Sequence, residues 1–175
     1  MPWKLENWYV LDSQKLATER DGETLAKSEW HSLSKNWREA FPERTLDQIS
    51  NAVYVIWISN PLTFDYGELT SPTAYIGKGM AHVRFRDHIK TKLLPTQEVF
   101  ESAKFDFWVL ECESDEQART SEAEMLRYFE ETYGRLPIFN RNRPSPSAVA
   151  AHPDCWAPLD RRRIGKQRTW AVRPL

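Results

Sequence analysis

The chain has 175 residues, of which 41% are hydrophobic and 28% charged, and its formal net charge is −1. This length favours one domain with appendages over several domains. No run approaches the roughly 18 apolar residues of a membrane span, and the N-terminus lacks the basic start and apolar block of a secretory signal, so we expect no membrane association. Cys112 and Cys155 are too few for a disulfide framework or a zinc-ligand pattern, and they favour a reducing, cytoplasmic location.

The small net charge conceals an uneven distribution along the chain. Through Gly134 there are 15 Lys and Arg against 23 Asp and Glu, whereas from Arg135 onward there are 9 against 2. A basic end on an acidic body is typical of proteins with a polyanionic partner, although basic tails also serve solubility.

The first half of the chain predicts helices followed by two strands. Residues 1–50 read as mostly helical, with a break near Asp21 and Gly22 and an end at Pro42. The run AVYVIWIS at 52–59 is short, β-branched and aromatic, which predicts a buried strand. Residues 60–72 carry turn signals and predict a loop, and residues 73–77 predict a second strand that pairs with the first as a hairpin with a long connection.

The second half predicts a helix, a strand and another helix. Residues 80–93 predict an amphipathic helix closed by Pro95, and residues 103–113 predict a third strand. A second helix begins at a capping box formed by Ser114 and Gln117 and ends at Gly134. The fold class is therefore α+β, with a small β-β-α-β-α core and a three-stranded antiparallel sheet flanked by helices. We expect a helical extension at 1–50, the core domain at 51–142 and a basic, irregular tail at 143–175.

Several side chains with catalytic chemistry cluster in or near the predicted hairpin and the helix after it. Tyr54 lies in the first strand, Tyr75 near the end of the second, and Lys78 on a predicted turn between Gly77 and Gly79. Arg84 and His88 follow this turn and are four residues apart, so they share one face of the predicted helix. Each has an ordinary explanation in packing or solvation. Together they suit holding a cation, clamping a phosphate and moving a proton.

An acidic residue in the last helix completes this set. Glu122 falls inside an apolar stripe, where a carboxylate is costly unless it is paired or binds a metal. Glu124 faces a more polar side of the helix and resembles a surface residue, but it stays an alternative to Glu122 as a metal ligand.

The order of these residues resembles the GIY-YIG nuclease superfamily. AVY at 52–54 and YIG at 75–77 resemble its two signature tripeptides, Arg84 and His88 have its Arg-x-x-x-His spacing, and Glu122 resembles its single acidic residue on a later helix. PIFN resembles its closing Pro-x-x-Asn and places Asn140. The resemblance covers roughly residues 50–142. It departs from the family at Ala52 and Val53, in a longer loop between the tripeptides, and in the distance from Glu122 to Asn140.

The resemblance implies hydrolysis of DNA phosphodiester bonds with one Mg²⁺ or Mn²⁺. Glu122 would be the only protein ligand of the metal, and Tyr54 would take a proton from the attacking water. Tyr75 and His88 would orient the water and phosphate or relay the proton, and Arg84 would bind the phosphate. Supporting roles would fall to Gly77, Lys78 and Asn140, the last through local hydrogen bonds.

Further basic residues extend this predicted phosphate site. They are expected to follow the nucleic-acid backbone, and they are Lys90, Lys92, Arg141, Arg143, Arg161, Arg162, Arg163, Lys166 and Arg168. DNA is the expected partner, with RNA as an alternative. A catalytically inactive nucleic-acid-binding module, a phosphatase or nucleotide hydrolase, and a structural partner-binding protein are the competing interpretations. The sequence shows no dimer signature, but double-strand cleavage would need either a dimer or two cleavage events, so a dimer stays an alternative.

Overall fold

The computed structural model describes residues 7–14, 16, 22–59, 62–67, 69–101, 103–143, 149–159 and 170–173. Its centre is a four-stranded antiparallel sheet in the order β1-β6-β2-β5. The strands are β1 (Trp8–Gln14), β2 (Ala52–Ser59), β5 (Thr73–Gly79) and β6 (Lys104–Glu111). The predicted α+β class, the strands at 52–59 and 103–113 and the hairpin-like pairing of β2 with β5 are confirmed.

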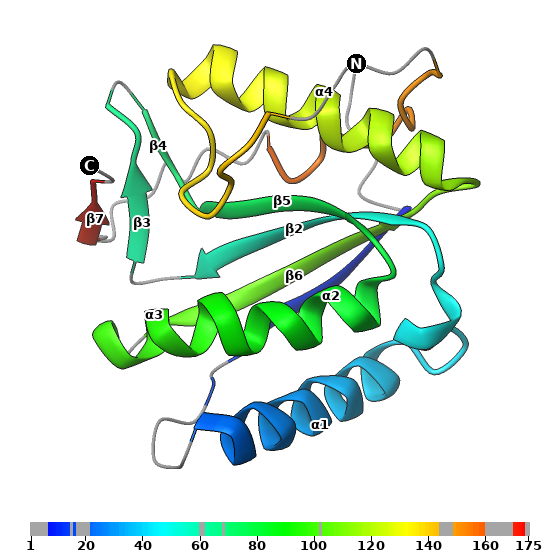
Figure 1. Ribbon diagram of the computed structural model, residues 1–175, viewed down its shortest axis with the longest axis vertical. Coiled ribbons are helices and arrows are strands. Elements are labelled where there is room, and N and C mark those ends of the chain that lie inside the picture. Colours follow the sequence, from blue (N-terminus) through cyan, green and yellow to red (C-terminus); the bar gives the residue numbers. More distant parts are fainter. Residues whose placement is uncertain are drawn as a thin grey trace.

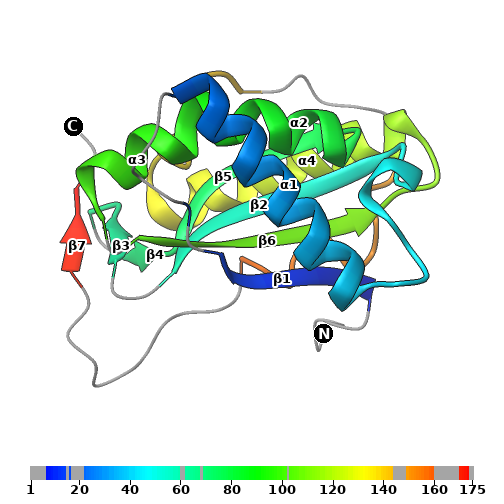
Figure 2. The same cartoon turned by 90° about the horizontal axis from the view of Figure 1, so that it is seen from below.

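Helices cover both faces of the sheet. Figure 1 shows α4 (Asp115–Tyr133) on one side, and α1 (Gly22–Ala40), α2 (Ala81–His88) and α3 (Leu94–Val99) on the other. Figure 2, a view from below, shows α1 in front of the strands and α4 behind them. Because β2 is covered on both faces, its residues from Ala52 to Ile58 are all buried, which explains the continuous apolar run in the sequence.

The prediction for the N-terminal region is wrong at residues 8–14. They form β1, which pairs with β6 at the edge of the sheet, so the sheet has four strands where three were predicted. Trp8 and Leu11 are buried there, and the Trp8 indole packs edge-on against Trp108 with ring centroids 6.1 Å apart. The run WYVL is β-prone, but only a partner distant in the sequence gives it a sheet to join. The helix after it begins at Gly22, where the break was predicted.

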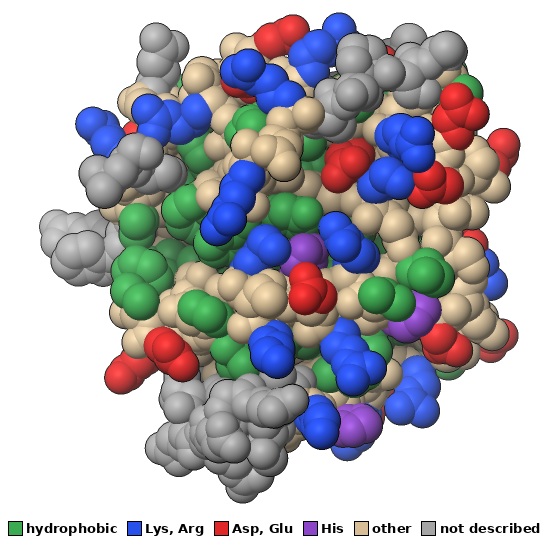
Figure 3. Space-filling view, in the orientation of Figure 1, with side chains coloured by type: hydrophobic (Ala, Val, Ile, Leu, Met, Phe, Trp, Pro, Cys, Tyr) green, Lys and Arg blue, Asp and Glu red, His purple; other side chains and the backbone are tan. Residues whose placement is uncertain are grey.

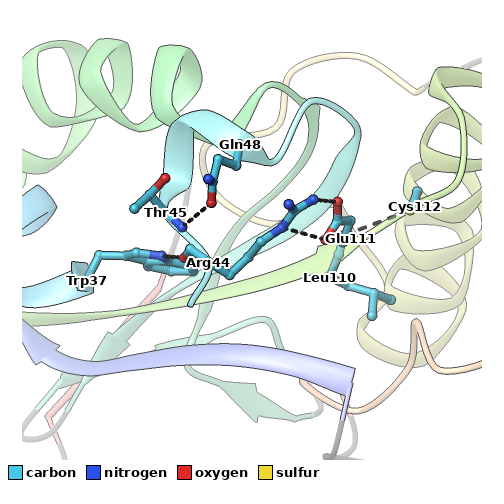
Figure 4. Close-up of polar contacts among 7 residues, drawn as sticks. All are labelled: Trp37, Arg44, Thr45, Gln48, Leu110, Glu111 and Cys112. Carbon is cyan, nitrogen blue, oxygen red and sulfur yellow. Dashed lines mark hydrogen bonds and ion pairs between the residues drawn. The ribbon is translucent and has the colours of Figure 1, made fainter. Parts of the chain in front are cut away.

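The connection from α1 to β2 is fixed by polar contacts, which Figure 4 shows. The Trp37 indole donates to the carbonyl of Arg44 at 2.8 Å, and the Arg44 guanidinium pairs with Glu111 at the end of β6. The short helix η2 (Leu46–Gln48) begins at Thr45, whose backbone N–H donates to the Gln48 side chain at 3.0 Å. These contacts tie α1 to the end of β6.

The predicted loop at 60–72 contains two short strands. They are β3 (Leu62–Asp65) and β4 (Thr70–Ser71), and they form a second sheet with β7 (Trp170–Val172) in the order β4-β3-β7. The prediction of an irregular tail is therefore wrong at 170–172, where the chain runs parallel to β3. Turn residues such as Gly67, with φ 115°, gave the loop signal, and the pairing that makes these strands is non-local.

The prediction that Pro95 closes the helix at 80–93 is also wrong. The chain runs from α2 through the π-helical turn η3 (Ile89–Leu93) directly into α3. Pro95 lies in the first turn of α3, where its missing N–H breaks no bond that a new helical turn requires. The helix consequently extends to Val99.

The last helix follows its prediction closely. Ser114 Oγ accepts from the backbone N–H of Gln117 at 3.1 Å, and the Gln117 side chain accepts from Glu113 N at 2.9 Å. Gly134 ends the helix in a left-handed conformation with φ 77°. Among the described residues, no helix is long and apolar enough to cross a membrane.

Candidate active site

Tyr54 and Tyr75 come from neighbouring strands and meet on the face of the sheet that α2 covers. In the β2–β5 register, Tyr54 lies opposite Gly77 and Tyr75 opposite Ile56. The two phenol rings are 6.0 Å apart between centroids, and the His88 ring lies 4.6 Å from the ring of Tyr75. Tyr54 is fully buried, whereas Tyr75 is half-buried and lines an open groove.

The Tyr54 hydroxyl is the centre of a hydrogen-bond network from α2. Its oxygen lies 2.9 Å from His88 Nε2, and the Arg84 Nε–H donates to it at 3.4 Å. The prediction that Arg84 and His88 share a helix face is thus confirmed, and both point at the same oxygen. His88 is 1% exposed, whereas Arg84 is exposed. The Tyr54 hydroxyl therefore has one buried partner and one partner that solvent reaches.

Lys92 determines which ring nitrogen of His88 carries the proton. Its Nζ lies 3.1 Å from His88 Nδ1 and 5.1 Å from the centroid of the Tyr75 ring. An ammonium group can only donate, so Nδ1 must accept and the ring proton lies on Nε2. His88 therefore donates to the Tyr54 oxygen, which receives a second donor from Arg84. Two donors to one phenol oxygen favour its phenolate form.

Burial opposes that effect. It raises the pKa of Tyr54 well above its ordinary value, and it raises the pKa of Tyr75 as well. For His88, burial and then the charges of Lys92 and Arg84 lower the pKa to about 3, which keeps the imidazole neutral at physiological pH. The hydrogen bond with Tyr54 raises the pKa of Arg84. The site therefore holds a protonated phenol, a neutral imidazole and two cations.

Gly77 is required by the two tyrosines. A Cβ at this position would lie 2.5 Å from Tyr75 Cε1 and 2.7 Å from the Tyr54 hydroxyl oxygen. Both rings are held by strands and neighbours, so neither could move aside cheaply. The predicted turn between Gly77 and Gly79 is wrong, because β5 continues to Gly79. Of these two glycines, Gly79 has the positive φ, 119°, and it leads into α2. Lys78 lies in the strand and its Nζ pairs with Asp115 at 2.6 Å.

Glu122 reaches the same site from α4. Its carboxyl group is close enough to Tyr54 and Tyr75 to affect their ionisation. Burial raises the pKa of Glu122 to about 7, although the charges of Lys78 and Arg84 act in the opposite direction. Among the described residues, its carboxylate forms no hydrogen bond or ion pair.

Glu124 belongs to a different part of the surface. Its carboxylate lies 3.8 Å from Arg127, its side chain is 40% exposed, and its charge acts on Cys155. The geometry therefore brings Glu122, and not Glu124, to the tyrosines.

The residues present fit a metal site with one protein ligand. No group of three or more His, Cys, Asp or Glu side chains that could hold a metal occurs in the described part of the chain. Mg²⁺ keeps several waters and uses one or two carboxylates, so a single carboxylate on a water-accessible groove matches its chemistry. Glu122 would be that ligand.

Asn140 extends the edge of the sheet at the site. Its side-chain Oδ1 accepts from Ile76 N at 3.0 Å and its Nδ2 donates to Ile76 O at 2.7 Å, which imitates a paired strand. Phe139 N donates to the carbonyl of Ala74 at 3.0 Å. The segment after α4 is thereby held against β5, as the predicted supporting role of Asn140 requires.

A groove of about 920 Å³ opens beside the tyrosines. Figure 3 shows it as a hollow with an apolar floor and Lys and Arg side chains around it. It runs between η3 and α3 on one side and α4 with the segment after it on the other, and it includes Tyr75, Lys92, Glu122 and Asn140.

The predicted nucleic-acid-binding residues fall into three groups: exposed residues, one lysine that faces inward, and residues outside the described part of the chain. Lys90, Arg141 and Arg143 are exposed, and Arg143 pairs with Glu130. Lys92 turns inward to His88, a role that the sequence prediction missed although positions 84, 88 and 92 follow helical spacing. Five of the predicted residues lie outside the described part of the chain, and these are Arg161, Arg162, Arg163, Lys166 and Arg168.

Comparisons with known proteins add no relative: no family model, curated protein or solved structure matches this chain.

Proposed function

We propose that this protein is a metal-dependent endonuclease that hydrolyses DNA phosphodiester bonds, as its resemblance to the GIY-YIG superfamily implies. The observation that supports the proposal is the meeting of Tyr54, Tyr75, Arg84, His88 and Glu122 from β2, β5, α2 and α4. Tyr75 and Glu122 line one open groove, and the buried Tyr54 and His88 contact Tyr75, although the five positions span most of the predicted core domain. RNA is the alternative substrate.

In the proposed reaction, Tyr54 first loses its phenolic proton to solvent, and the resulting phenolate then takes a proton from the attacking water. The donors from His88 and Arg84 stabilise the negative charge that its oxygen carries as a phenolate. A guanidinium has five N–H donors, so Arg84 can contact Tyr54 through Nε and bind a phosphate oxygen with its other donors. Lys92 holds the His88 ring in the donating tautomer.

Glu122 would hold the cation, Mg²⁺ or Mn²⁺, which supplies charge stabilisation at the leaving oxygen. Its pKa of about 7 means that the carboxyl group is only partly ionised at neutral pH without a cation. A positive ion beside it favours the charged form, so binding of the cation releases a proton. We further propose a reducing, cytoplasmic location, because Cys112 and Cys155 are buried and free.

The test is nicking of supercoiled plasmid with Mg²⁺ or Mn²⁺. Wild type, Tyr54→Phe and Glu122→Ala are compared, with Glu124→Ala as the matched control on the same helix. We expect nicking by wild type and the control, none in excess EDTA, and loss in the first two variants. Loss in Glu124→Ala alone would contradict the proposed ligand. Metal-independent nicking, or equal nicking by all four proteins, would contradict the mechanism.

One observation favours a second candidate, a nucleic-acid-binding module without cleavage. Complete burial of Tyr54 raises its pKa, which opposes the deprotonation that the mechanism needs. This module would bind plasmid, branched or single-stranded DNA and cut none of them with either metal. The same assay, combined with a binding measurement, distinguishes the two candidates.

A further inference from the structure

The groove beside the candidate active site differs from a surface built only for a sugar–phosphate backbone. Its end near the tyrosines is polar and carries Tyr75, Lys92 and Glu122. Its apolar side chains include Val99 and Phe100 at the end of α3 and Ile138 and Phe139 after α4, and these four define its apolar end. Ile138 and Phe139 bond through their backbone N–H groups to the Tyr66 hydroxyl and the Ala74 carbonyl, which precede Tyr75 in the chain. Val99 is 71% exposed, and both phenylalanines are half-buried, so apolar surface is presented to solvent beside charged residues.

The position of the apolar end relates it to the proposed chemistry. Val99 follows His88 by eleven residues along the nearly continuous helix α2–η3–α3, which corresponds to roughly 16 Å at 1.5 Å per residue. Because this length exceeds the spacing of adjacent phosphates, a strand whose phosphate lies at Arg84 would carry a nucleotide a few positions away over the apolar end. Arg141 also lines the groove, close enough to Lys92 for its charge to help lower the pKa of that lysine, and it suits an additional phosphate.

In duplex DNA the bases are stacked inside and the outward surface is anionic and polar, so a duplex offers this apolar end little to bind. An unpaired nucleotide exposes the face of its base, and aromatic side chains bind such faces by stacking. The cationic residues Lys92 and Arg141 match the charge of the attached phosphates. We infer that the apolar end of the groove binds an unpaired base a few nucleotides from the scissile phosphate, so that the substrate is single-stranded or flapped DNA. This inference rests on the proposed function for the scissile phosphate, whereas binding itself is measured without cleavage.

The test is fluorescence anisotropy in EDTA with three labelled DNAs of matched length: a blunt duplex, the same duplex with a single-stranded flap, and a single strand. We expect the flap and the single strand to bind at least about fivefold more tightly than the duplex, the lower range for stacking one base. Phe100→Leu and Phe139→Leu keep apolar packing but lose the ring face, and each should reduce that preference several-fold while duplex binding stays unchanged.

Phe41→Leu is the matched control, because Phe41 is a half-buried ring that packs on Tyr9 and Trp37 away from the groove. Val99→Ser tests the same surface at a position whose exposure leaves folding unaffected, and it should weaken flap binding as well. Equal affinity for the three DNAs, or a preference that survives all three groove variants, would overturn the inference. Plasmid nicking without flap preference refutes the groove proposal alone. If flap preference depends on Phe139 but no DNA is cut with either metal, the proposed nuclease function is refuted and the groove proposal stands.

Discussion

The two halves of the candidate site are organised in different ways. On the α2–η3 side, Arg84, His88 and Lys92 are joined to Tyr54 by hydrogen bonds that fix the orientation of each group. On the α4 side, Glu122 contributes a carboxyl group that burial keeps partly protonated at neutral pH, and no described residue forms a hydrogen bond or ion pair with it. The first half is arranged by the protein itself. The second half has unsatisfied capacity for a positive charge, which is what a metal ligand needs.

Replacing Glu122 should have the largest effect on activity. It should lower nicking but raise the stability of the folded protein. Glu122→Gln removes the proposed metal ligand, so metal-dependent nicking should fall by about a thousandfold or more, the scale of a lost electrostatic stabiliser. The native pKa of about 7 exceeds the ordinary 4.5, so this group's contribution to stability is full below pH 4.5 and is lost as pH rises through 7. The neutral glutamine avoids that loss.

In EDTA and above pH 7, the free energy of unfolding of Glu122→Gln should therefore exceed that of wild type by about 1–3 kcal/mol, and the variant should unfold at a higher temperature. The two proteins should converge in stability near pH 4.5. Glu124→Gln is the control and should leave both nicking and the pH dependence unchanged. A variant less stable than wild type at pH 8 would show that Glu122 is ionised and paired in the native protein.

Gly77→Ala should be the most damaging change on the strand side. The added methyl would overlap the rings of Tyr54 and Tyr75, which costs about 1–3 kcal/mol for overpacking. Displacing the proposed base by about 1 Å should lower nicking about a hundredfold. Thermal unfolding and nicking are measured together.

Gly79→Ala separates ring displacement from backbone strain. Its φ of 119° makes alanine unfavourable, but the nearest atom to a new Cβ is Arg84 Cγ at 3.7 Å. We expect a similar loss of stability with a much smaller loss of nicking. Equal loss of activity in both variants would contradict the ring-packing explanation.

Lys92→Met tests how the first half is held together. Methionine keeps an apolar chain near Tyr75 but cannot donate to His88 Nδ1, so the imidazole should become a mixture of tautomers. ¹⁵N NMR of the ring nitrogens should show a proton on Nε2 in wild type and loss of that preference in the variant. Nicking should fall about tenfold to a hundredfold, as for other groups that orient a reacting residue.

Lys90→Met, on the exposed side of η3, is the control for the loss of one charge. The His88 tautomer should stay as in wild type, and the nicking of DNA at low salt should change by no more than a few-fold. A wild-type His88 protonated on Nδ1 would refute the assignment, whatever the activity of the variant.

Asn140→Ala should have the smallest effect on chemistry and a clear effect on stability. It removes both hydrogen bonds to Ile76, at a cost of about 1–3 kcal/mol when backbone groups lose partners. Asn142→Ala, two residues along in the same groove wall and exposed, is the control. If both variants unfold at the wild-type temperature, the Asn140 contact does not hold this segment against β5.

The sequence by itself determined the elements that depend on local pattern. The strands at 52–59 and 103–113, the capped helix from Ser114 to Gly134 and the shared face of Arg84 and His88 follow from alternation, propensity and spacing between near neighbours. The candidate site residues were also readable, because the resemblance depends on residue types in order.

Only the tertiary structure decided what depends on contacts between distant segments. β1 and β7 become strands because β6 and β3 offer edges, and no local signal reveals such a partner. The choice between Glu122 and Glu124 depends on which face of α4 meets β2 and β5. Lys90 and Lys92 have the same side-chain chemistry, so the sequence does not distinguish their roles. The inward position of Lys92 follows from the π-helical turn and from the placement of His88.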